Sequence, residues 1–400
     1  MDTDKHRWLL SAVICVHLWL IPASARVKTG LDVLVEQKFA PLAGKRVGLI
    51  TNHSGLTYDR RHIVDVLAAA PGVKLVAVFT PEHGIAGTRD DENVESSTHP
   101  KLGIPVHSLH FKGRYRPTPE MLKGVDVLVY DIQDVGARFY TYITTLGYCL
   151  EEAAKAKIPF YVLDRPNPIT GAAVDGPPID AKNFSFVGYT VMPTRHGMTI
   201  GELARMYNGE KKLGADLHVI EMQGWRRSMW LDDTGLEWRN PSPALRSLTA
   251  TIMYTGTCLM EGREVSVGRG TAKPFELVGA PWFKGHEVTD YLNSLKIPGV
   301  SFLNVRFTPS ESDLKGQECD GVEVQLLDRN KLDNGLLGLS MAAAIMKFHP
   351  GKFTPRITLL GSDDALARLK RGESGATIVA SYQKDLQAFR QMREKYLLYK

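Results

Sequence analysis

An acidic side chain with the setting of a proton donor follows an apolar run early in this 400-residue sequence. Glu82 comes three residues after the run 75–79, between Pro81, which stiffens the turn, and Gly84, which permits unusual dihedral angles. A carboxyl group at the mouth of an apolar sheet is poorly solvated, and desolvation favours the protonated form that a general acid needs. We therefore interpret Glu82 as a candidate general acid, and a carboxylate that caps the next helix is the alternative.

A second group of polar residues follows the apolar run 127–130. Residues 131–142 contain two acids, an amide, an arginine and two tyrosines, which is dense for a simple turn. Asp131 is the candidate for a second functional carboxylate in this group. Structural explanations stay open for the others, because Asp134 with Arg138 can form a local ion pair and Tyr142 can belong to the core.

A third group is the glycine-spaced, charged segment 261–271, which follows another apolar run. Glycines free backbone amides, and together with Arg269 these amides suit an anion or sugar hydroxyls. A solvated hairpin is the competing explanation, since glycine and charge are also typical of exposed turns.

Other chemistries lack their sequence signatures. The histidines of residues 53–110 are scattered and come without an HExxH or cysteine pattern, so we expect structural or substrate-contacting histidines and no metal. No Gly-x-Ser-x-Gly motif marks a serine nucleophile. The run ending at Ile50 continues as Thr-Asn-His-Ser-Gly, without the glycine fingerprint of dinucleotide sites, so we expect no cofactor.

The elements that must position these residues form a regular pattern. Four apolar runs, at 47–50, 75–79, 127–130 and 160–163, each end abruptly in polar residues and alternate with helix-like segments such as 62–70 and 142–157. This alternation predicts parallel βαβ units in a Rossmann-like sheet. The carboxyl ends of parallel strands share one edge, where ligands bind, so we expect distant polar loops to meet in one cleft.

The length of the chain indicates two domains. A stretch rich in proline, glycine and aspartate, 164–192, marks the connection. Beyond it, Thr199 and Glu202 predict a capping box at a helix start, and mixed strands and helices follow. We expect an α/β protein with a Rossmann-like domain at 26–185 and a smaller α+β domain at 186–400.

Residues 1–25 have the three parts of a secretory signal: a charged start, an apolar stretch at 8–21, and Ala23-Ser24-Ala25 before the expected cleavage. An uncleaved anchor is the alternative, but about 14 apolar residues are short for a membrane span. We therefore expect an exported protein, periplasmic or extracellular, without a stable membrane anchor. The three cysteines beyond this segment are widely spaced, which favours buried thiols over a disulfide framework. The net charge of +5 comes from dispersed lysines and arginines, so nucleic acid is not indicated.

The chain closely resembles the DUF1343 family, which is associated with exo-β-N-acetylmuramidases of the NamZ type in glycoside hydrolase family 171. The segments that carry the resemblance are 80–84, 130–142, 163–168, 195–199, 241–243 and 268–276. The resemblance implies a Rossmann-like domain and a smaller domain with the active site in a cleft between them. It also implies an exported enzyme that removes N-acetylmuramic acid from the non-reducing end of peptidoglycan fragments. Its partners are then muramyl saccharides.

Within this resemblance we expect Glu82 to protonate the leaving glycosidic oxygen. Asp131, or as a second choice Glu261, supplies negative charge or activates water, and His83 and Gln133 orient the sugar. One of three arginines binds the lactyl carboxylate of muramic acid: Arg138, Arg165 or Arg269. Further substrate-binding candidates at strand ends or in matching segments are Asn52, Asp134, Tyr140, Asp164, Asn167, His196 and Thr271.

Three stereochemical routes stay open. A retaining pair of carboxyl groups lies about 5 Å apart and an inverting pair about 6.5 to 9.5 Å apart, and the substrate acetamide can also take part. Two other classes of protein compete with this interpretation. A non-catalytic periplasmic binding protein for cell-wall sugars needs no acid, whereas an amidase or esterase needs a metal or nucleophile that the sequence does not indicate.

Overall fold

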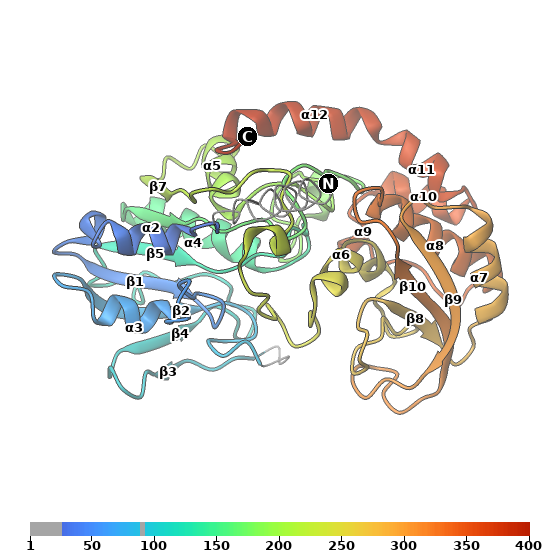
Figure 1. Ribbon diagram of the computed structural model, residues 1–400, viewed down its shortest axis with the longest axis horizontal. Helices are drawn as coiled ribbons and strands as arrows, with labels where there is room; N and C mark the ends of the chain where they lie inside the picture. Colours follow the sequence, from blue (N-terminus) through green and yellow to red (C-terminus); the bar gives the residue numbers. More distant parts are fainter. Residues whose placement is uncertain (1–25, 89–92) are drawn as a thin grey trace, which may run out of the picture.

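The computed structural model describes residues 26–88 and 93–400, which form two lobes with a C-terminal helix arching over both (Figure 1). The predicted signal sequence, 1–25, lies outside the described residues. Within the described part, every helix is too short or too polar to cross a membrane.

The first lobe is built on a seven-stranded sheet in the order β3-β4-β2-β1-β5-β6-β7. Its neighbouring strands pair in parallel, except that β3 pairs antiparallel with β4. The strands are β1 (Arg46–Thr51), β2 (Lys74–Thr80), β3 (Ser97–Thr98), β4 (Pro105–Ser108), β5 (Val127–Asp131), β6 (Phe160–Leu163) and β7 (Leu217–Ile220). The four strands predicted from apolar runs are confirmed as β1, β2, β5 and β6.

Helices cover both faces of this sheet, which explains why its central strands are apolar throughout. Val127 and Val129 of β5 pack in one cluster with Leu31 and Leu34, whereas Leu128 and other residues that alternate with them join a second cluster. This alternation follows the two-residue period of a strand. The helices of this lobe are α2 (Gly30–Glu36), α3 (Ile63–Ala68), α4 (Tyr142–Ala156) and α5 (Ile200–Glu210).

The second lobe has a three-stranded antiparallel sheet in the order β8-β10-β9 and a group of helices around α8. Its strands are β8 (Leu277–Ala280), β9 (Val300–Phe307) and β10 (Cys319–Leu326). Its helices are α6 (Leu248–Thr257), α7 (Gly285–Ser294), α8 (Asn334–Phe348), α9 (Ile357–Leu360), α10 (Asp363–Lys370), α11 (Gly375–Ser381) and α12 (Gln383–Arg393). Short 3-10 helices lie at Ala40–Leu42, Ala181–Asn183, Leu231–Thr234, Cys258–Met260 and Glu394–Tyr396.

The division between the lobes differs from the predicted boundary between residues 185 and 186. Helix α5 and strand β7 lie beyond that boundary, yet β7 pairs in parallel with β6 and extends the large sheet. The Pro- and Gly-rich stretch is therefore a long loop within the first lobe. Thr199 and Glu202 form the predicted capping box at the start of α5. The described cysteines are free and buried, as expected.

The chain end returns to the first lobe after α12, which spans the top of the molecule in Figure 1. The hydroxyl of Tyr399 donates a hydrogen bond of 2.6 Å to Asp164, just after β6. Arg393 donates hydrogen bonds to the carbonyl oxygens of His196 and Gly197 before α5. These contacts fix one lobe against the other.

Candidate active site

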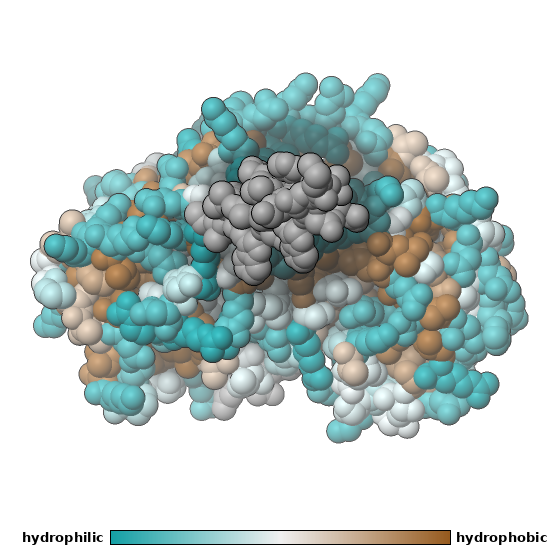
Figure 2. Space-filling view, in the orientation of Figure 1, coloured by the Kyte–Doolittle hydropathy of each residue, from teal (hydrophilic) through white to brown (hydrophobic). Residues whose placement is uncertain are grey.

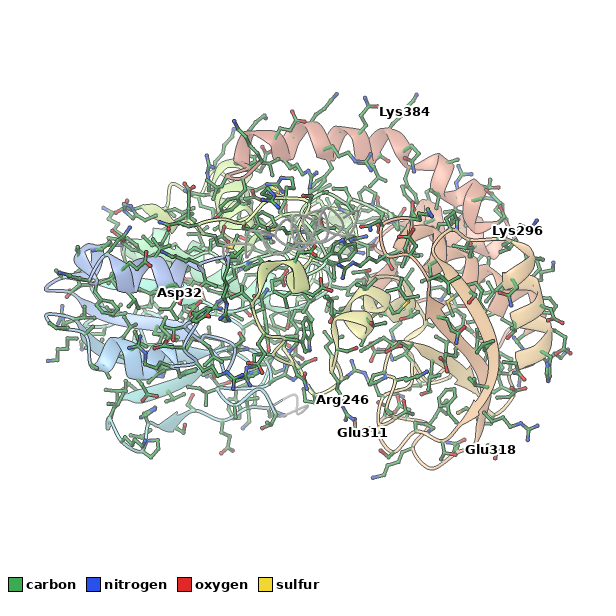
Figure 3. The ribbon with its side chains drawn as sticks, in the orientation of Figure 1. Asp32, Arg246, Lys296, Glu311, Glu318 and Lys384 are labelled. Atoms are coloured by element: carbon green, nitrogen blue, oxygen red, sulfur yellow. The ribbon has the colours of Figure 1, made fainter. Side chains whose placement is uncertain are left out.

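A cavity of about 340 Å³ lies where the two lobes meet. The first lobe contributes loops after β2 and before α4, and the second contributes α6 and the segment that follows it. In the space-filling view the lower outline of the molecule is indented between the lobes (Figure 2). Arg246 and Glu311 lie close together at the lower end of this boundary, 3.9 Å apart (Figure 3).

Glu82 lines this cavity from the loop after β2. Its side chain is 29% exposed, so the carboxylate reaches the cavity. The hydroxyl of Thr141 donates a 2.5 Å hydrogen bond to Oε2, and His110 Nε2 lies 3.7 Å from Oε1. The next residue, His83, also lines the cavity and has a φ of 68°, which the following Gly84 at 71° continues. This left-handed turn places two consecutive polar side chains at one cavity wall.

Glu261 lines the same cavity from the other lobe, immediately after the apolar segment that continues α6. Arg269 Nε donates a 2.5 Å hydrogen bond to Glu261 Oε1, and Cys258 Sγ lies 3.3 Å from Oε2. Burial lowers the pKa of Arg269, but the Glu261 carboxylate more than compensates, so the net shift is upward. Glu261 and Arg269 thus line, from the second lobe, the same cavity that Glu82 lines from the first.

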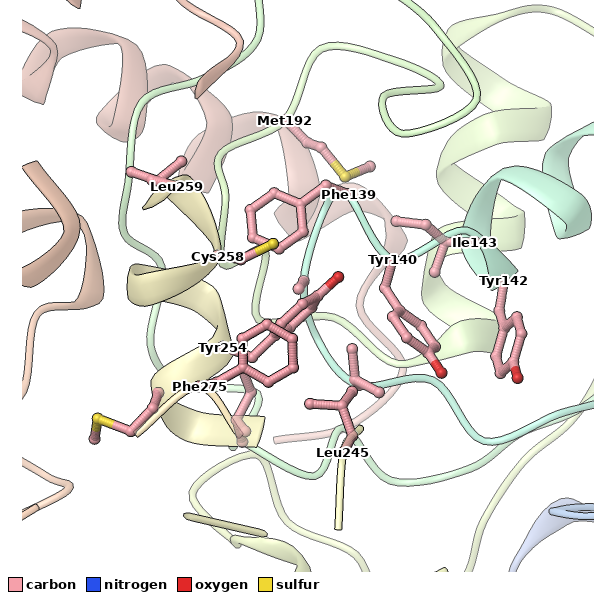
Figure 4. Packing of buried hydrophobic residues seen from close by; sticks show 14 of the residues in the cluster. Phe139, Tyr140, Tyr142, Ile143, Met192, Leu245, Tyr254, Cys258, Leu259 and Phe275 are labelled. Carbon is pink, nitrogen blue, oxygen red and sulfur yellow. The ribbon is translucent and has the colours of Figure 1, made fainter. Parts of the chain in front are cut away.

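Aromatic rings also line this cavity, and Figure 4 shows Phe139, Tyr140, Tyr254 and Phe275 packed close together. The ring of Tyr254 packs edge to face against the rings of Phe139, Phe275 and Tyr140, with distances between ring centroids of 5.0, 4.7 and 6.1 Å. Burial raises the pKa values of Tyr140 and Tyr254 well above the usual range, so both hydroxyls keep their protons and can donate. Rings with polar hydroxyls beside carboxylates suit the apolar faces and hydroxyls of a sugar.

The structure corrects the role predicted for Asp131. Its side chain is fully buried, and Arg165 holds both carboxylate oxygens, with Nε 2.5 Å from Oδ1 and Nη2 2.9 Å from Oδ2. Neither residue lines the cavity that Glu82 faces. Asp131 and Arg165 therefore act as a structural pair that joins the ends of β5 and β6, and Glu261, the second choice, is the carboxylate that lines the cavity together with Glu82.

Two further acids predicted to bind substrate are also internal. Asp164 is buried and accepts hydrogen bonds from Tyr399, Thr199 and the backbone of Gly201. Burial raises the pKa of Asp164 to about 7. Asp134 is buried and accepts a 2.7 Å hydrogen bond from the backbone of Gly136. These acids organise loops and do not line the cavity.

Buried partners of these acids are likewise structural. His196 is fully buried, with Nε2 3.6 Å from Asp134. Asn167 is buried, donates to the carbonyl of Met198 and accepts from the backbone of Ile169. Asn52 is buried and accepts from the backbone and hydroxyl of Ser54. The polar residues at the strand ends therefore lie close together as predicted, but most of them contact one another and do not line the cavity.

The remaining candidates divide between loops and pockets. Arg138 is fully buried and donates to the carbonyls of Leu359 and Leu360, and burial lowers its pKa to about 10. Thr271 donates to the carbonyl of Gly268 within its loop and does not line the cavity. Gln133 lines a different pocket of the first lobe. Of the three arginines proposed for the lactyl group, Arg269 is the one that lines the cavity.

Several cavity residues were not among the sequence candidates. Thr141 and Phe139 lie inside the dense segment 131–142, and that density was the signal that could have identified them. Tyr254 and Ser242 come from segments without a charged motif. The packing of α6 against the first lobe brings Tyr254 to the site, whereas Ser242 precedes α6 and belongs to the matching segment 241–243. Among the described residues, no cluster of three or more acids, histidines or cysteines has the arrangement of a metal site.

Comparisons with known proteins match this chain along nearly its whole length. Two family models, described as the N-terminal and C-terminal parts of the exo-beta-N-acetylmuramidase NamZ, match residues 47–249 and 252–399. The chain is 45% identical over 382 residues to the peptidoglycan beta-N-acetylmuramidase NamZ of Bacillus subtilis (strain 168), covering 94% of this chain and 92% of that protein.

Two solved structures of DUF1343 family proteins from Bacteroides fragilis NCTC 9343 have the same fold. One shares 38% identity with a TM-score of 0.86, and the other shares 32% identity with a TM-score of 0.76. Each alignment covers 94% of this chain and 99% of the matched chain. The chain belongs to the NamZ (DUF1343) family of exo-β-N-acetylmuramidases.

Proposed function

We propose that this protein is an exo-acting glycoside hydrolase that removes β-1,4-linked N-acetylmuramic acid from the non-reducing end of peptidoglycan fragments. Its family and the activity in the name of its Bacillus subtilis relative support the substrate class. The observation that carries the chemistry is that Glu82 and Glu261, from different lobes, line one cavity. Glycoside hydrolysis uses a pair of carboxyl groups on either side of the scissile bond.

Glu82 acts as the general acid in this proposal. It transfers a proton to the glycosidic oxygen as the bond from that oxygen to the anomeric carbon breaks. The Thr141 hydroxyl, 2.5 Å from Glu82 Oε2, then stabilises the carboxylate that the proton transfer leaves. Glu82 is thus held by one donor while its side chain stays accessible to substrate.

Glu261 supplies the second carboxylate. The transition state of glycoside hydrolysis carries positive charge on the sugar ring, and a nearby negative charge stabilises it. The 2.5 Å contact with Arg269 Nε fixes the direction of the Glu261 side chain. Asp131 cannot take this role, because Arg165 and the surrounding residues enclose it completely.

We assign recognition of the lactyl carboxylate to Arg269, since it lines the cavity and Arg138 and Arg165 do not. Replacing Arg269 with glutamine should reduce kcat/KM for a chromogenic muramide by more than for the corresponding glucosaminide, which lacks the lactyl group. Equal losses on both substrates would contradict lactyl recognition. The substitution can also disturb Glu261, but that effect lowers kcat/KM for both substrates equally. The ratio of the two losses in kcat/KM therefore reports on the lactyl group alone.

One incubation separates the candidate functions. The protein is mixed with a muramyl-glucosamine disaccharide and the products are identified by mass spectrometry. A hydrolase adds one water and releases free N-acetylmuramic acid and N-acetylglucosamine. An unchanged disaccharide bound in a one-to-one ratio would instead identify a binding protein. Action on acyl or peptide groups alone would identify an amidase or esterase.

Export to the periplasm or the cell exterior is part of the proposal. Its support is the signal-like pattern of residues 1–25 and the location of peptidoglycan outside the cytoplasm. The mass of the protein purified from its native host should correspond to a chain that starts at Arg26. A full-length chain in the membrane fraction would contradict this part.

A further inference from the structure

A second pocket, of about 60 Å³, lies in the first lobe and shares no lining residue with the cavity that Glu82 lines. A cavity needs about 10 to 15 Å³ to hold one water molecule. The pocket therefore has room for a few waters or for one small polar group. Ser54 follows β1, Gln133 follows β5 and Arg165 follows β6, and all three line it. The pocket therefore lies at the carboxyl edge of the large sheet.

This edge has the topology that favours ligand binding. The chain runs from β1 to β2 on one side, and β5 lies on the other side of β1, so strand order reverses between β1 and β5. Ligands of open α/β sheets bind outside the strand ends at such a switch point. The backbone of Gln133 donates to the hydroxyl of Ser54 and joins the two loops there. The expected ligand position and the observed pocket coincide.

The lining is strongly basic. Among the described residues, four arginines and one glutamate line the pocket, and one of these arginines, Arg165, is already paired with the buried Asp131. Arg60 and Arg239 both pair with the same oxygen of Glu237, at 2.8 and 3.1 Å, so a single carboxylate balances two guanidinium groups. Because these two guanidinium groups share one carboxylate, they can also donate hydrogen bonds to a further anion. A carboxylate or phosphate group fits both the charge and the volume.

Arg26 adds an unfilled donor to this pocket. Its guanidinium lies over the ring of Tyr58, 3.1 Å from the centroid. Its Nε is buried and has no hydrogen-bond partner among the described residues. This Nε is free to donate a hydrogen bond to an acceptor on a ligand. Tyr58 and Trp238 supply aromatic surfaces of the kind that pack against sugar rings.

One short segment connects this pocket to the catalytic cavity. Trp238 lines the pocket and Ser242 lines the cavity. Four residue steps span at most about 14 Å. The segment is held in place, because the carbonyl of Asn240 lies 2.6 Å from His53 Nε2 and the carbonyl of Pro241 accepts from Tyr142. The lining residues Trp238 and Ser242 therefore lie within the length of a short glycan fragment of each other.

We propose that the arginine pocket binds the lactyl carboxylate of a second muramyl residue, two sugars beyond the linkage that is cleaved. The inference rests on the proposed function, because muramic acid and glucosamine alternate along the peptidoglycan glycan. It assigns to the first lobe a subsite that selects longer fragments over disaccharides.

The test compares kcat/KM for release of the first N-acetylmuramic acid from a muramyl-glucosamine disaccharide and from the tetrasaccharide that repeats it. The wild-type protein should prefer the tetrasaccharide. Arg239→Ala should lower kcat/KM for the tetrasaccharide by about fivefold, because the partly exposed pair between Arg239 and the second lactyl carboxylate is lost. The disaccharide lacks this second carboxylate, so its kcat/KM should not show a matching loss. Glu237→Gln should raise the tetrasaccharide value, since it frees Arg60 and Arg239 from their shared acid.

Arg306→Ala is the matched control, because Arg306 forms an exposed pair with Glu318 in the second lobe. It should change neither value. A tetrasaccharide with its inner lactyl carboxylate amidated should lose the preference in the wild-type protein. Equal rates on both glycans, or equal effects of the variants on both, would overturn the inference while leaving the hydrolase function intact. No turnover of either glycan would overturn the hydrolase function itself.

Discussion

Glu82 and Asp131 occupy corresponding places in the large sheet but have opposite surroundings. Strands β2 and β5 flank β1, and each acid stands at or just after the carboxyl end of its strand. The Glu82 side chain is 29% exposed and faces a cavity, whereas the Asp131 side chain is 0% exposed and is held by Arg165. Position at the strand end brings an acid to the functional edge, and its neighbours decide whether it meets a ligand.

The neighbours differ for a simple reason. Beyond β5, the chain after β6 carries Arg165, whose guanidinium reaches back to both oxygens of Asp131. Beyond β2, the neighbouring strand is β4, and the residues near Glu82 are the hydroxyl of Thr141 and the imidazole of His110. One acid is neutralised and enclosed, and the other stays accessible. The comparison predicts a loss of activity for one substitution and a loss of stability for the other.

The largest effect is expected for Glu82→Gln. Removing a general acid typically reduces the rate by about 10²- to 10⁴-fold, so kcat on the disaccharide should fall by at least a hundredfold while the melting temperature stays unchanged. The matched control is Glu264→Gln, an exposed acid in the neighbouring loop of the second lobe. Steady-state kinetics and thermal melting of both variants test the claim. Comparable activity of the Glu82 variant and its control would contradict the assignment of Glu82 as the general acid.

Asp131→Asn should have the opposite profile. It leaves the buried Arg165 guanidinium without its charge partner, which typically costs about 3 to 5 kcal/mol in the free energy of unfolding. The activity of the molecules that remain folded should change little. Denaturant titration measures the loss, with Asp126→Asn as control, because Asp126 pairs with Arg46 at the surface and should contribute little. An Asp131 variant that is stable but inactive would contradict the structural role of Asp131 and would indicate a catalytic one.

Thr141→Val sharpens the comparison at the catalytic side. It keeps the shape of residue 141 but removes the hydrogen bond to Glu82 Oε2. We expect kcat to fall by at least about tenfold, since hydrogen bonds to charged groups contribute about 1.5 to 3 kcal/mol. Thr141→Ser, which retains the hydroxyl, should preserve most of the activity. Equal loss in the valine and serine variants would show that packing, and not the hydroxyl, matters.

The smallest effect concerns pH. Asp164 resembles Asp131 in being buried after a strand, and burial raises its pKa from 3.8 to about 7. Between about pH 4 and pH 7 the folded carboxyl keeps a proton that the unfolded chain releases. The free energy of unfolding should therefore fall as pH rises through this window.

Asn does not titrate, so Asp164→Asn should show a shallower decline with pH than the wild-type protein. Urea unfolding at several pH values measures both slopes. The slope that remains in the variant includes Asp175, whose pKa burial also raises to about 7. Identical slopes in the two proteins would contradict the assignment to Asp164.

The sequence predicted the sheet well because its central strands are buried on both faces and read as apolar runs. It also identified Glu82, His83, Tyr140, Glu261 and Arg269, which line the cavity. Their motifs combine charge or ring systems with glycine or proline, and such combinations are visible without knowledge of the fold.

The sequence could not show which strand-end residues would pair with one another. The contact of Arg165 with Asp131 depends on side-chain directions at the ends of two adjacent strands. The hydrogen bond of Tyr399 to Asp164 joins residues more than two hundred positions apart, through a helix that crosses both lobes. The predicted boundary at residue 186 was misplaced for a similar reason, since β7 joins the sheet after a long irregular loop.

The most direct test of the account is a crystal structure of the Glu82→Gln protein with an uncleaved muramyl-glucosamine disaccharide. We predict that the glycosidic oxygen lies within hydrogen-bond distance of side chain 82, with the muramyl ring between the two lobes and beside Glu261. A disaccharide bound elsewhere, with its glycosidic oxygen far from residue 82, would contradict the central claim.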